Sequence, residues 1–491
     1  MEKSSMRKSA LVRLRTNSQQ QLLQKQPEQH TQQGSVSTSA NAHEAPLVSG
    51  NLWKAIWVMS WPLLVATMAT SLVDLVNVQV AGRLGSASQA AVGLAEQIIF
   101  IFQVFLLSVG VGTTAIVSRA YGRNDKDDVD FATAQSLSLS IMIGLALTAV
   151  ALLSAHFVIP LLSQEAEMST NCNLYLSIFA LYLVPFSFVC IANAAFRAIG
   201  NARIPLVIIS TEVIINIAGD YLTVVHNFPT PGLGVRGIAG SAVVGALVAS
   251  IMAFMFLRGS QLKESLRQLL PLSAPLLNRI VNIGVPAALQ RLSWGLSVCG
   301  LFFILSKVEH PTAALAAWTI GMRIEGMLFL PEMALSMAVS SIVGQNLGAN
   351  RIDRAFRAGW AVTGIGAFLM GTVGIAIFAF ARELAASMNA HDAATMECTT
   401  MYLQINAFGA VSQAVNAILS GALQGAGDTK ATMWISIVCN WLIRLPLAWV
   451  LAVHMQMGAN GAWIAMATSA TLAAIAVSFR FKSGGWIGRK I

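Results

Sequence analysis

The sequence predicts an all-α polytopic membrane protein with twelve transmembrane helices in two pseudo-symmetric six-helix bundles. Of its 491 residues, 55% are hydrophobic and only 11% are charged, a composition far from that of a soluble domain. The mean hydropathy of +0.66 agrees with this class. A second observation is internal duplication, because the Pro and Gly positions of the first half recur roughly 225 residues later.

Twelve apolar stretches are long enough to cross a bilayer as helices, since a membrane core needs about 20 helical residues. They cover residues 53–80, 92–118, 133–162, 174–199, 204–226, 237–257, 276–306, 313–343, 357–381, 401–424, 431–455 and 461–480. Strands of a membrane barrel would be about ten residues long and alternate in polarity. These stretches are longer and do not alternate, so helices are expected.

The two halves interrupt their apolar stretches at matching places. The matching positions are Pro62, Tyr121-Gly122, Gly200 and Gly234/Gly237 in the first half, and Pro286, Leu347-Gly348, Gly427 and Gly458/Gly461 in the second. In the same alignment, Asn216 and Asp220 fall opposite Asn440 and Arg444. A duplicated membrane bundle is the usual build of a secondary transporter, whose substrate site lies between or inside the halves.

Basic residues predict the orientation in the membrane. One set of loops and both tails hold 24 of the 31 Lys and Arg residues, and the opposite loops hold only Arg83, Arg236, Lys307 and Arg382. Both termini are therefore expected in the cytoplasm, with the chain in the inner (cytoplasmic) membrane. The net charge of +9 is then a topology signal, and the lipid bilayer rather than nucleic acid is the expected partner.

The composition divides the chain into five segments. They are a disordered, Gln- and Ser-rich cytoplasmic tail (1–50), an N-terminal bundle (51–260), a cytoplasmic linker (261–275), a C-terminal bundle (276–482) and a short cytoplasmic tail (483–491). The cysteines and histidines are scattered without metal-ligand spacing, so no metal centre or cofactor is expected. The chain also lacks a complete phosphate-binding loop, and active transport would therefore use an ion gradient.

Charged residues within the spans are the candidates for chemistry, because a charge at mid-bilayer costs about 2.5–3.5 kcal/mol on insertion scales. The acids are Asp74, Glu212, Asp220, Glu325 and Glu332, and the cations are Arg291, Arg323 and Arg444.

The fifth span has the sharpest pattern. Glu212, Asn216 and Asp220 are spaced by four residues and therefore share one helix face. A carboxylate beside an amide can hold a proton, or a Na⁺ whose preferred ligands are oxygens. The alternative is a satisfied polar cluster that only fixes helix packing.

The first span carries a similar stripe of Thr67, Thr70, Asp74 and Asn77 on one face. Pro62 permits a helix bend there, because its missing amide leaves a carbonyl without a partner. Bending coupled to protonation would form a gate, whereas a Thr/Asn stripe could instead mediate close packing.

In the eighth span, Glu325 and Glu332 are seven residues apart and share a face. Arg323 is two residues from Glu325 and cannot pair with it along the helix, so local ion pairs with other helices are expected. Arg444 is the simplest partner for an acid of another helix.

The chain resembles the multidrug and toxic compound extrusion (MATE) family over about residues 51–482. The resemblance rests on an ordered set of phrases: Trp61-Pro62, Val80–Gly85, Ser118–Gly122, Arg197–Asn201, Gly344–Ala349 and Leu423–Asp428. It implies a V-shaped central cavity between two bundles and the export of organic cations in exchange for protons or Na⁺, by a protein expected to act as a monomer.

The resemblance also implies roles for particular residues. Asn216 and Asp220 look like the fifth-helix pair of the branch that includes the DNA-damage-inducible transporters, and Asn193 is expected to join them. Gln290 stands where the other branch has an acid, which favours coupling in the first half. The family's first-helix acid falls on Asn77, and Asp74 lies one turn earlier on the same face, so either residue could fill that position.

Two other functions remain open from the sequence. The first is a flippase for lipid-linked sugars, which would use cations in its cavity to bind a pyrophosphate group, and Arg291, Arg323 and Arg444 are candidates for these cations. The second is the export of an endogenous metabolite. An integral membrane enzyme would need clustered His, Asp or Cys residues at one interface, and the sequence suggests no such cluster. We therefore expect an antiporter and not an enzyme.

Overall fold

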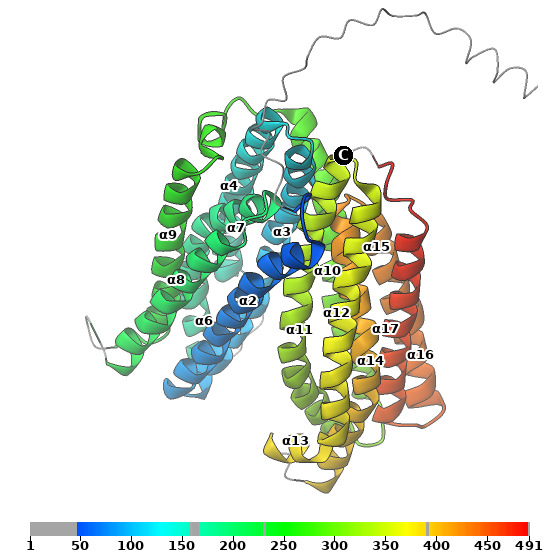
Figure 1. The fold of residues 1–491 in the computed structure, drawn as a ribbon. Helices are drawn as coiled ribbons and strands as arrows, with labels where there is room; N and C mark the ends of the chain where they lie inside the picture. The colour runs from blue at the N-terminus through cyan, green and yellow to red at the C-terminus, as the bar shows by residue number, and fades with distance from the viewer. Residues whose placement is uncertain are drawn as a thin grey trace, which may run out of the picture. The chain divides into compact units, whose positions relative to one another are not determined.

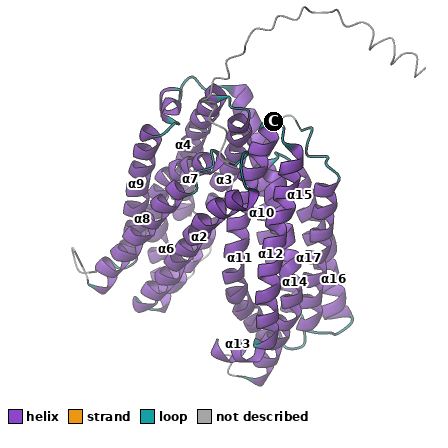
Figure 2. Ribbon diagram, viewed as in Figure 1, coloured by secondary structure: helices purple, strands orange, loops and turns teal. Residues whose placement is uncertain are grey.

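The computed structural model describes residues 47–157, 159, 166–226, 228, 232–388 and 392–489, and the regular elements in these ranges are all helical (Figure 2). The fold class predicted from the sequence is therefore confirmed. Of the predicted tail 1–50, all but the last four residues lie outside the described ranges.

The first half contains six spans. They are α2 (Leu52–Arg83), α3 (Ser86–Gly122), α4 (Lys126–Phe157), α6 (Ala166–Phe179) continued through η1 (Ala180–Tyr182) into α7 (Leu183–Ala198), α8 (Arg203–Asp220) continued by the π-helix η2 (Tyr221–Val225), and α9 (Val235–Gly259). A 3₁₀ turn, η3 (Lys263–Arg267), lies in the linker to the second half.

The second half repeats this order. Its elements are α10 (Ala274–Leu305), α11 (Pro311–Gly348), α12 (Ile352–Ala379), the short α13 (Ala381–Ser387), α14 (Ala393–Gly425), α15 (Thr429–Ile437) with η4 (Val438–Arg444), α16 (Leu445–Trp449) and η5 (Val450–His454), and α17 (Ala459–Lys482). The segments α15 to η5 together form one span.

Eleven spans of the described chain are long and apolar enough to cross a membrane. The twelfth predicted span, 401–424, lies in the 33-residue α14. This helix is more polar, with Gln404, Asn406 and Gln413 among its residues, and it packs against α11, α12 and α17. These three amide residues are half-buried in the second half.

Several helices begin before the apolar stretch that predicted them. The span predicted at 133–162 begins at Lys126, because Asp127 and Asp128 occupy the first turn of α4. Acidic side chains at a helix N-terminus interact favourably with the helix dipole. Hydropathy alone does not register such turns, which extend the helices towards the water.

The two halves meet through α3 and α11, with α10 against α3 and α2 against α11 (Figure 1). These two flanking pairs are equivalent under the duplication, since α2 matches α10 and α3 matches α11. The first helix of each half, α2 or α10, also contributes side chains to the hydrophobic core of the other half. Ile56 and Leu63 of α2 pack in the second half, and Leu276 and Ile283 of α10 pack in the first.

The closest approach between the halves is reciprocal. A Cβ atom at Gly122 would overlap the carbonyl oxygen of Gln345, and one at Gly348 would overlap the carbonyl oxygen of Arg119. Because Arg119 and Gly122 are the repeat mates of Gln345 and Gly348, the same contact occurs twice, as at a two-fold symmetric interface. The repeated Gly of the sequence is therefore required by backbone contact between the halves.

Candidate functional site

A buried polar cluster lies in the first half around Asp220, whose side chain is 0% exposed at the end of α8. Asn77 of α2 faces it from the side. With the Asn77 amide oriented so that both of its polar atoms find partners, Nδ2 donates to Oδ2 of Asp220 at 2.7 Å and to the carbonyl oxygen of Val73 at 3.3 Å. The structure thus joins the first and fifth spans through this pair.

Two oxygens of the cluster have no partner. Oδ1 of Asp220 and Oδ1 of Asn216, one turn earlier on the same helix face, are buried and make no hydrogen bond in the structure. Leaving a buried polar atom unsatisfied costs about 1–3 kcal/mol. A proton shared between the two oxygens, or a small cation bound by both, would remove this penalty.

The remaining predicted residues of the first half differ in their contacts. Glu212 is partly buried and accepts a hydrogen bond from the hydroxyl of Tyr182 at 3.3 Å. Asn193 is buried in α7 with its Oδ1 unpaired. Ser241 of α9 packs against Gly219, the residue before Asp220, and so closes the cluster from the side of α9.

Asn77 is the first-helix candidate for which the described part of the structure gives a contact with Asp220. Asp74 lies one turn earlier in α2, and its side chain falls outside the described part of the structure. The hydroxyl of Thr67 donates to the carbonyl of Leu64 and lies 3.5 Å from the carbonyl of Leu330 in α11. Part of the predicted stripe therefore contributes to packing between the halves. Pro62 lies inside the continuous helix α2, and its role as a bend stays a prediction.

A second polar cluster lies inside the second half, around a pocket of about 70 Å³. Glu325 and Glu332 of α11 line it together with Arg444 of η4. Glu332 is 2% exposed with its Oε2 unpaired, and Nε of Arg444 donates to Oγ of Ser469 at 2.8 Å. If both acids are ionised, two carboxylates and one guanidinium leave one negative charge in the pocket, which a monovalent cation or a proton would balance.

The other polar residues predicted in this half do not line the pocket. Arg323 is exposed on α11. Gln290 accepts a hydrogen bond from Nε2 of Gln424 at 3.1 Å, which links α10 to α14, and Arg291 follows it on α10. Of the three arginines, only Arg444 lines this pocket. A flippase would need clustered cations to bind a pyrophosphate group, and this pocket does not provide them.

Several lining residues were not predicted from the sequence. Tyr402, Asn406 and Gln413 of α14 line the pocket, as do Trp294 and Trp318. The first three are spaced by four and seven residues and so share one face of α14. That spacing is the signal that would have found them.

Both clusters lie next to a π-helical segment. The π-helix η2 begins immediately after Asp220, and η4 ends at Arg444, the repeat mate of Asp220. Such segments widen the helix by one residue per turn and occur often at functional sites. The duplication therefore places an acid at one of these distortions and a cation at the other.

Comparison with known proteins agrees with this architecture. The MatE family model matches the chain twice, over residues 62–222 and 286–450, and the two matches begin at Pro62 and Pro286. The chain belongs to the MatE family. It is therefore a multi-pass membrane transporter and not an enzyme, and the duplication seen in the sequence corresponds to the two family domains.

Similar MatE proteins cover most of the chain. A probable multidrug resistance protein NorM of Thermotoga maritima is 26% identical over 408 residues, which span 82% of this chain and 86% of that protein. A protein with the same description from Bradyrhizobium diazoefficiens is 27% identical over 411 residues, 82% of this chain and 87% of its own.

Solved structures of this MatE fold match at lower identity. An outward-facing conformation of a multidrug resistance MATE family transporter of the MOP superfamily has a TM-score of 0.83 at 22% identity, covering 91% of this chain and 99% of that one. A MATE crystal structure in complex with MaL6 has a TM-score of 0.82 at 22% identity, covering 90% and 99%. At this identity the likeness shows the fold.

Proposed function

We propose that this MatE protein exports organic cations by exchanging them for protons or Na⁺, with Asp220 as the coupling carboxylate. The observation that carries the proposal is the fully buried Asp220, whose free Oδ1 lies on the same helix face as the free Oδ1 of Asn216. An ionisable group in a membrane span is expensive to keep without a role. The relatives described as multidrug resistance proteins support the substrate class.

The electrostatics of the cluster suggest how exchange works. Without a bound ion, the Asp220 carboxylate attracts a cationic substrate into the space between the bundles. A proton or Na⁺ entering from outside neutralises the carboxylate and weakens that attraction, so the substrate leaves outward. A protonated Asp220 would donate to a neighbouring acceptor, and Na⁺ would take carboxylate and amide oxygens as ligands, so the chemistry of the two free oxygens is compatible with either ion.

The topology completes the proposal. We place the loops that follow α3 and α11 in the cytoplasm, together with both termini, because the Lys and Arg residues concentrate on that side. The protein would then span the inner membrane as a monomer. The arrangement of Arg291, Arg323 and Arg444 favours this function over a lipid-linked sugar flippase.

Transport by purified protein in liposomes tests the proposal and identifies the ion. Vesicles with an acidic lumen should take up a fluorescent quaternary ammonium dye if protons leaving the lumen drive it, with the membrane potential clamped by K⁺ and valinomycin. A Na⁺-loaded lumen at uniform pH tests the other ion, and protein-free liposomes give the background. Absence of dye uptake under both gradients would contradict the organic-cation assignment and favour an endogenous metabolite.

Replacing Asn77 with Ala tests the contact between the first and fifth spans. The substitution removes the 2.7 Å hydrogen bond that Nδ2 of Asn77 donates to Oδ2 of Asp220. We expect the apparent affinity for the coupling ion to rise several-fold, because Asn77 stabilises the ion-free carboxylate and its loss, at a cost of about 1–3 kcal/mol, leaves an oxygen that a bound ion can satisfy. The half-saturating ion concentration in the liposome assay measures it.

Thr70→Ala is the matched control for this experiment. Thr70 lies on the same helix and donates only within it, to the carbonyl of Thr67 at 2.8 Å. Its removal should leave the ion dependence unchanged. Equal effects of the two substitutions would contradict a specific role of Asn77.

A further inference from the structure

The residues that follow α17, 483–489, form a segment that we call the strap. The strap is fixed to the second half by Trp486, which is fully buried. The indole of Trp486 stacks on Phe481 at 4.8 Å between ring centroids, and its Nε1 donates to the carbonyl oxygen of Phe481 at 2.7 Å. The strap is therefore part of the packed structure.

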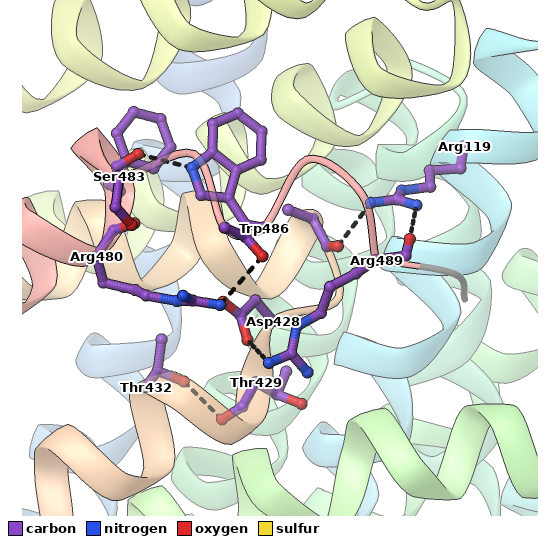
Figure 3. Close-up of polar contacts among 11 residues, drawn as sticks. Arg119, Asp428, Thr429, Thr432, Arg480, Ser483, Trp486 and Arg489 are labelled. Carbon is purple, nitrogen blue, oxygen red and sulfur yellow. Dashed lines mark hydrogen bonds and ion pairs between the residues drawn. The ribbon is translucent and has the colours of Figure 1, made fainter. Parts of the chain in front are cut away.

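Asp428 is the charged anchor of the strap. Its side chain is 0% exposed in the turn between α14 and α15, and it pairs with two guanidinium groups. Arg480 of α17 lies 2.7 Å from Oδ2, and Arg489 of the strap lies 2.8 Å from Oδ1 (Figure 3). One carboxylate thus ties the end of the strap to α14, α15 and α17, all of which belong to the second half.

Arg119 of α3 brings the first half into this network. Its Nη1 donates to the carbonyl oxygen of Arg489 at 2.7 Å, and its Nη2 donates to the carbonyl oxygen of Ala426 at 2.8 Å (Figure 3). A single guanidinium therefore crosses between the halves and holds both the strap and the end of α14. Hydrogen bonds from a charged donor are stronger than neutral ones.

Comparison of the two repeats shows which of the two Arg119 hydrogen bonds has an equivalent on the other side of the interface. Gln345, the repeat mate of Arg119, donates from Nε2 to the carbonyl of Ala198 at the end of α7, at 2.7 Å. This bond mirrors the one from Arg119 to Ala426, since α7 matches α14. The strap bond has no such mirror, because Gln345 carries one amide nitrogen where Arg119 carries a forked guanidinium.

These contacts lie at the end of the molecule where Gly122 and Gly348 bring the two halves into backbone contact. Alternating access requires the two bundles to rock against each other, so this end must open and close in each cycle. A buried ion pair is weak evidence for net stability, and in some proteins such pairs select one arrangement over another.

We propose that the strap is a latch: Arg119, Arg489 and Asp428 hold the two halves together at this end and release when it opens. The inference rests on the proposed function only in that a transporter of this build must open here. The latch sets the population of the open state and does not bind the transported cation.

Distance measurements between two spin labels test the latch without substrate or ion gradient. Asp127 and Asp353 are repeat mates, and both are exposed near the starts of α4 and α12. Labelled cysteines at these positions, in a full-length variant with the five native cysteines replaced, report the separation of the halves at this end.

Two substitutions weaken the latch in different ways. Arg119→Gln copies the repeat mate, keeping a donor for Ala426 and losing the strap bond, and Arg489→Ala removes one ion pair of Asp428. Each should raise the population at long label distance by about fivefold or more, the range of typical conformational coupling. Arg123→Ala is the matched control, since it breaks an exposed ion pair with Asp128 inside the first half.

The outcomes separate the latch from the proposed function. Unchanged distance distributions in both latch variants, or an equal change in Arg123→Ala, would overturn the latch. If Arg119→Gln does not give a folded, monodisperse protein, the test rests on Arg489→Ala. This variant removes only the side chain that pairs with Asp428 and keeps the backbone carbonyl that accepts from Arg119. A distance change in a protein that fails to export cations would keep the latch and reject the proposed function.

Discussion

Asp220→Asn is expected to abolish ion-coupled export while leaving the protein folded. Asn has nearly the same shape and can keep an oxygen towards Asn77, but it carries no charge and holds no proton or Na⁺. Removing one charge of a buried interacting pair costs about 2–5 kcal/mol, so binding of the coupling cation should weaken by about 10²-fold or more. Dye uptake into liposomes and release of the coupling ion measure the two sides of the exchange.

A matched control separates coupling from loss of any buried acid. Asp130 of α4 is 2% exposed and also has an unpaired Oδ1, but it lies near the linker and not in the Asp220 cluster. Asp130→Asn should therefore retain coupled export. Dye-driven ion release that persists at the normal level in Asp220→Asn would contradict the assignment of Asp220.

The second large effect is expected at the reciprocal glycine contact. Gly122→Ala or Gly348→Ala places a methyl group where the other half has a backbone carbonyl, and a backbone cannot move aside as a side chain can. Overpacking typically costs about 1–3 kcal/mol, and we expect the upper part of that range for either substitution. Thermal unfolding of the purified protein, followed by tryptophan fluorescence, measures the loss.

Gly93→Ala serves as the control on the same helix, α3. A Cβ at Gly93 meets nothing within 4 Å, so this substitution gains about 0.5–1 kcal/mol of helix propensity without a clash. The predicted shifts in unfolding temperature thus have opposite signs. The double variant at positions 122 and 348 should lose less than the sum of the single losses, because the two residues share one interface. A stabilised Gly122→Ala protein would contradict the tight contact.

Prediction from the sequence succeeded where the signal is local or repeated. Apolar length predicted the spans, and the repeated Pro and Gly positions predicted two bundles, which the two family matches confirm. The i, i+4 spacing placed Asn216 and Asp220 on one face. Charged first turns such as that of α4 were missed, because hydropathy reports burial in lipid and not helix formation.

Contacts between distant segments could not be predicted in this way. Nothing in the spacing of the first span favours Asn77 over Asp74 as the partner of Asp220, since both lie on the same face. The hydrogen bond from Arg119 to Arg489 joins residues 370 positions apart, and Arg489 lies in a segment predicted only as a short tail. The coupling assignment of Asp220 itself stays a prediction until transport is measured.

The sequence by itself determined that this chain is a duplicated helical transporter with acids inside its first half. Those properties follow from residue type and periodicity, which are local. Only the tertiary structure decided which polar groups face one another, because rotation and tilt of packed helices bring single atoms into contact. It placed Asn77 against Asp220, collected Glu325, Glu332 and Arg444 around one pocket, and closed one end of the molecule through Gly122, Gly348 and the strap.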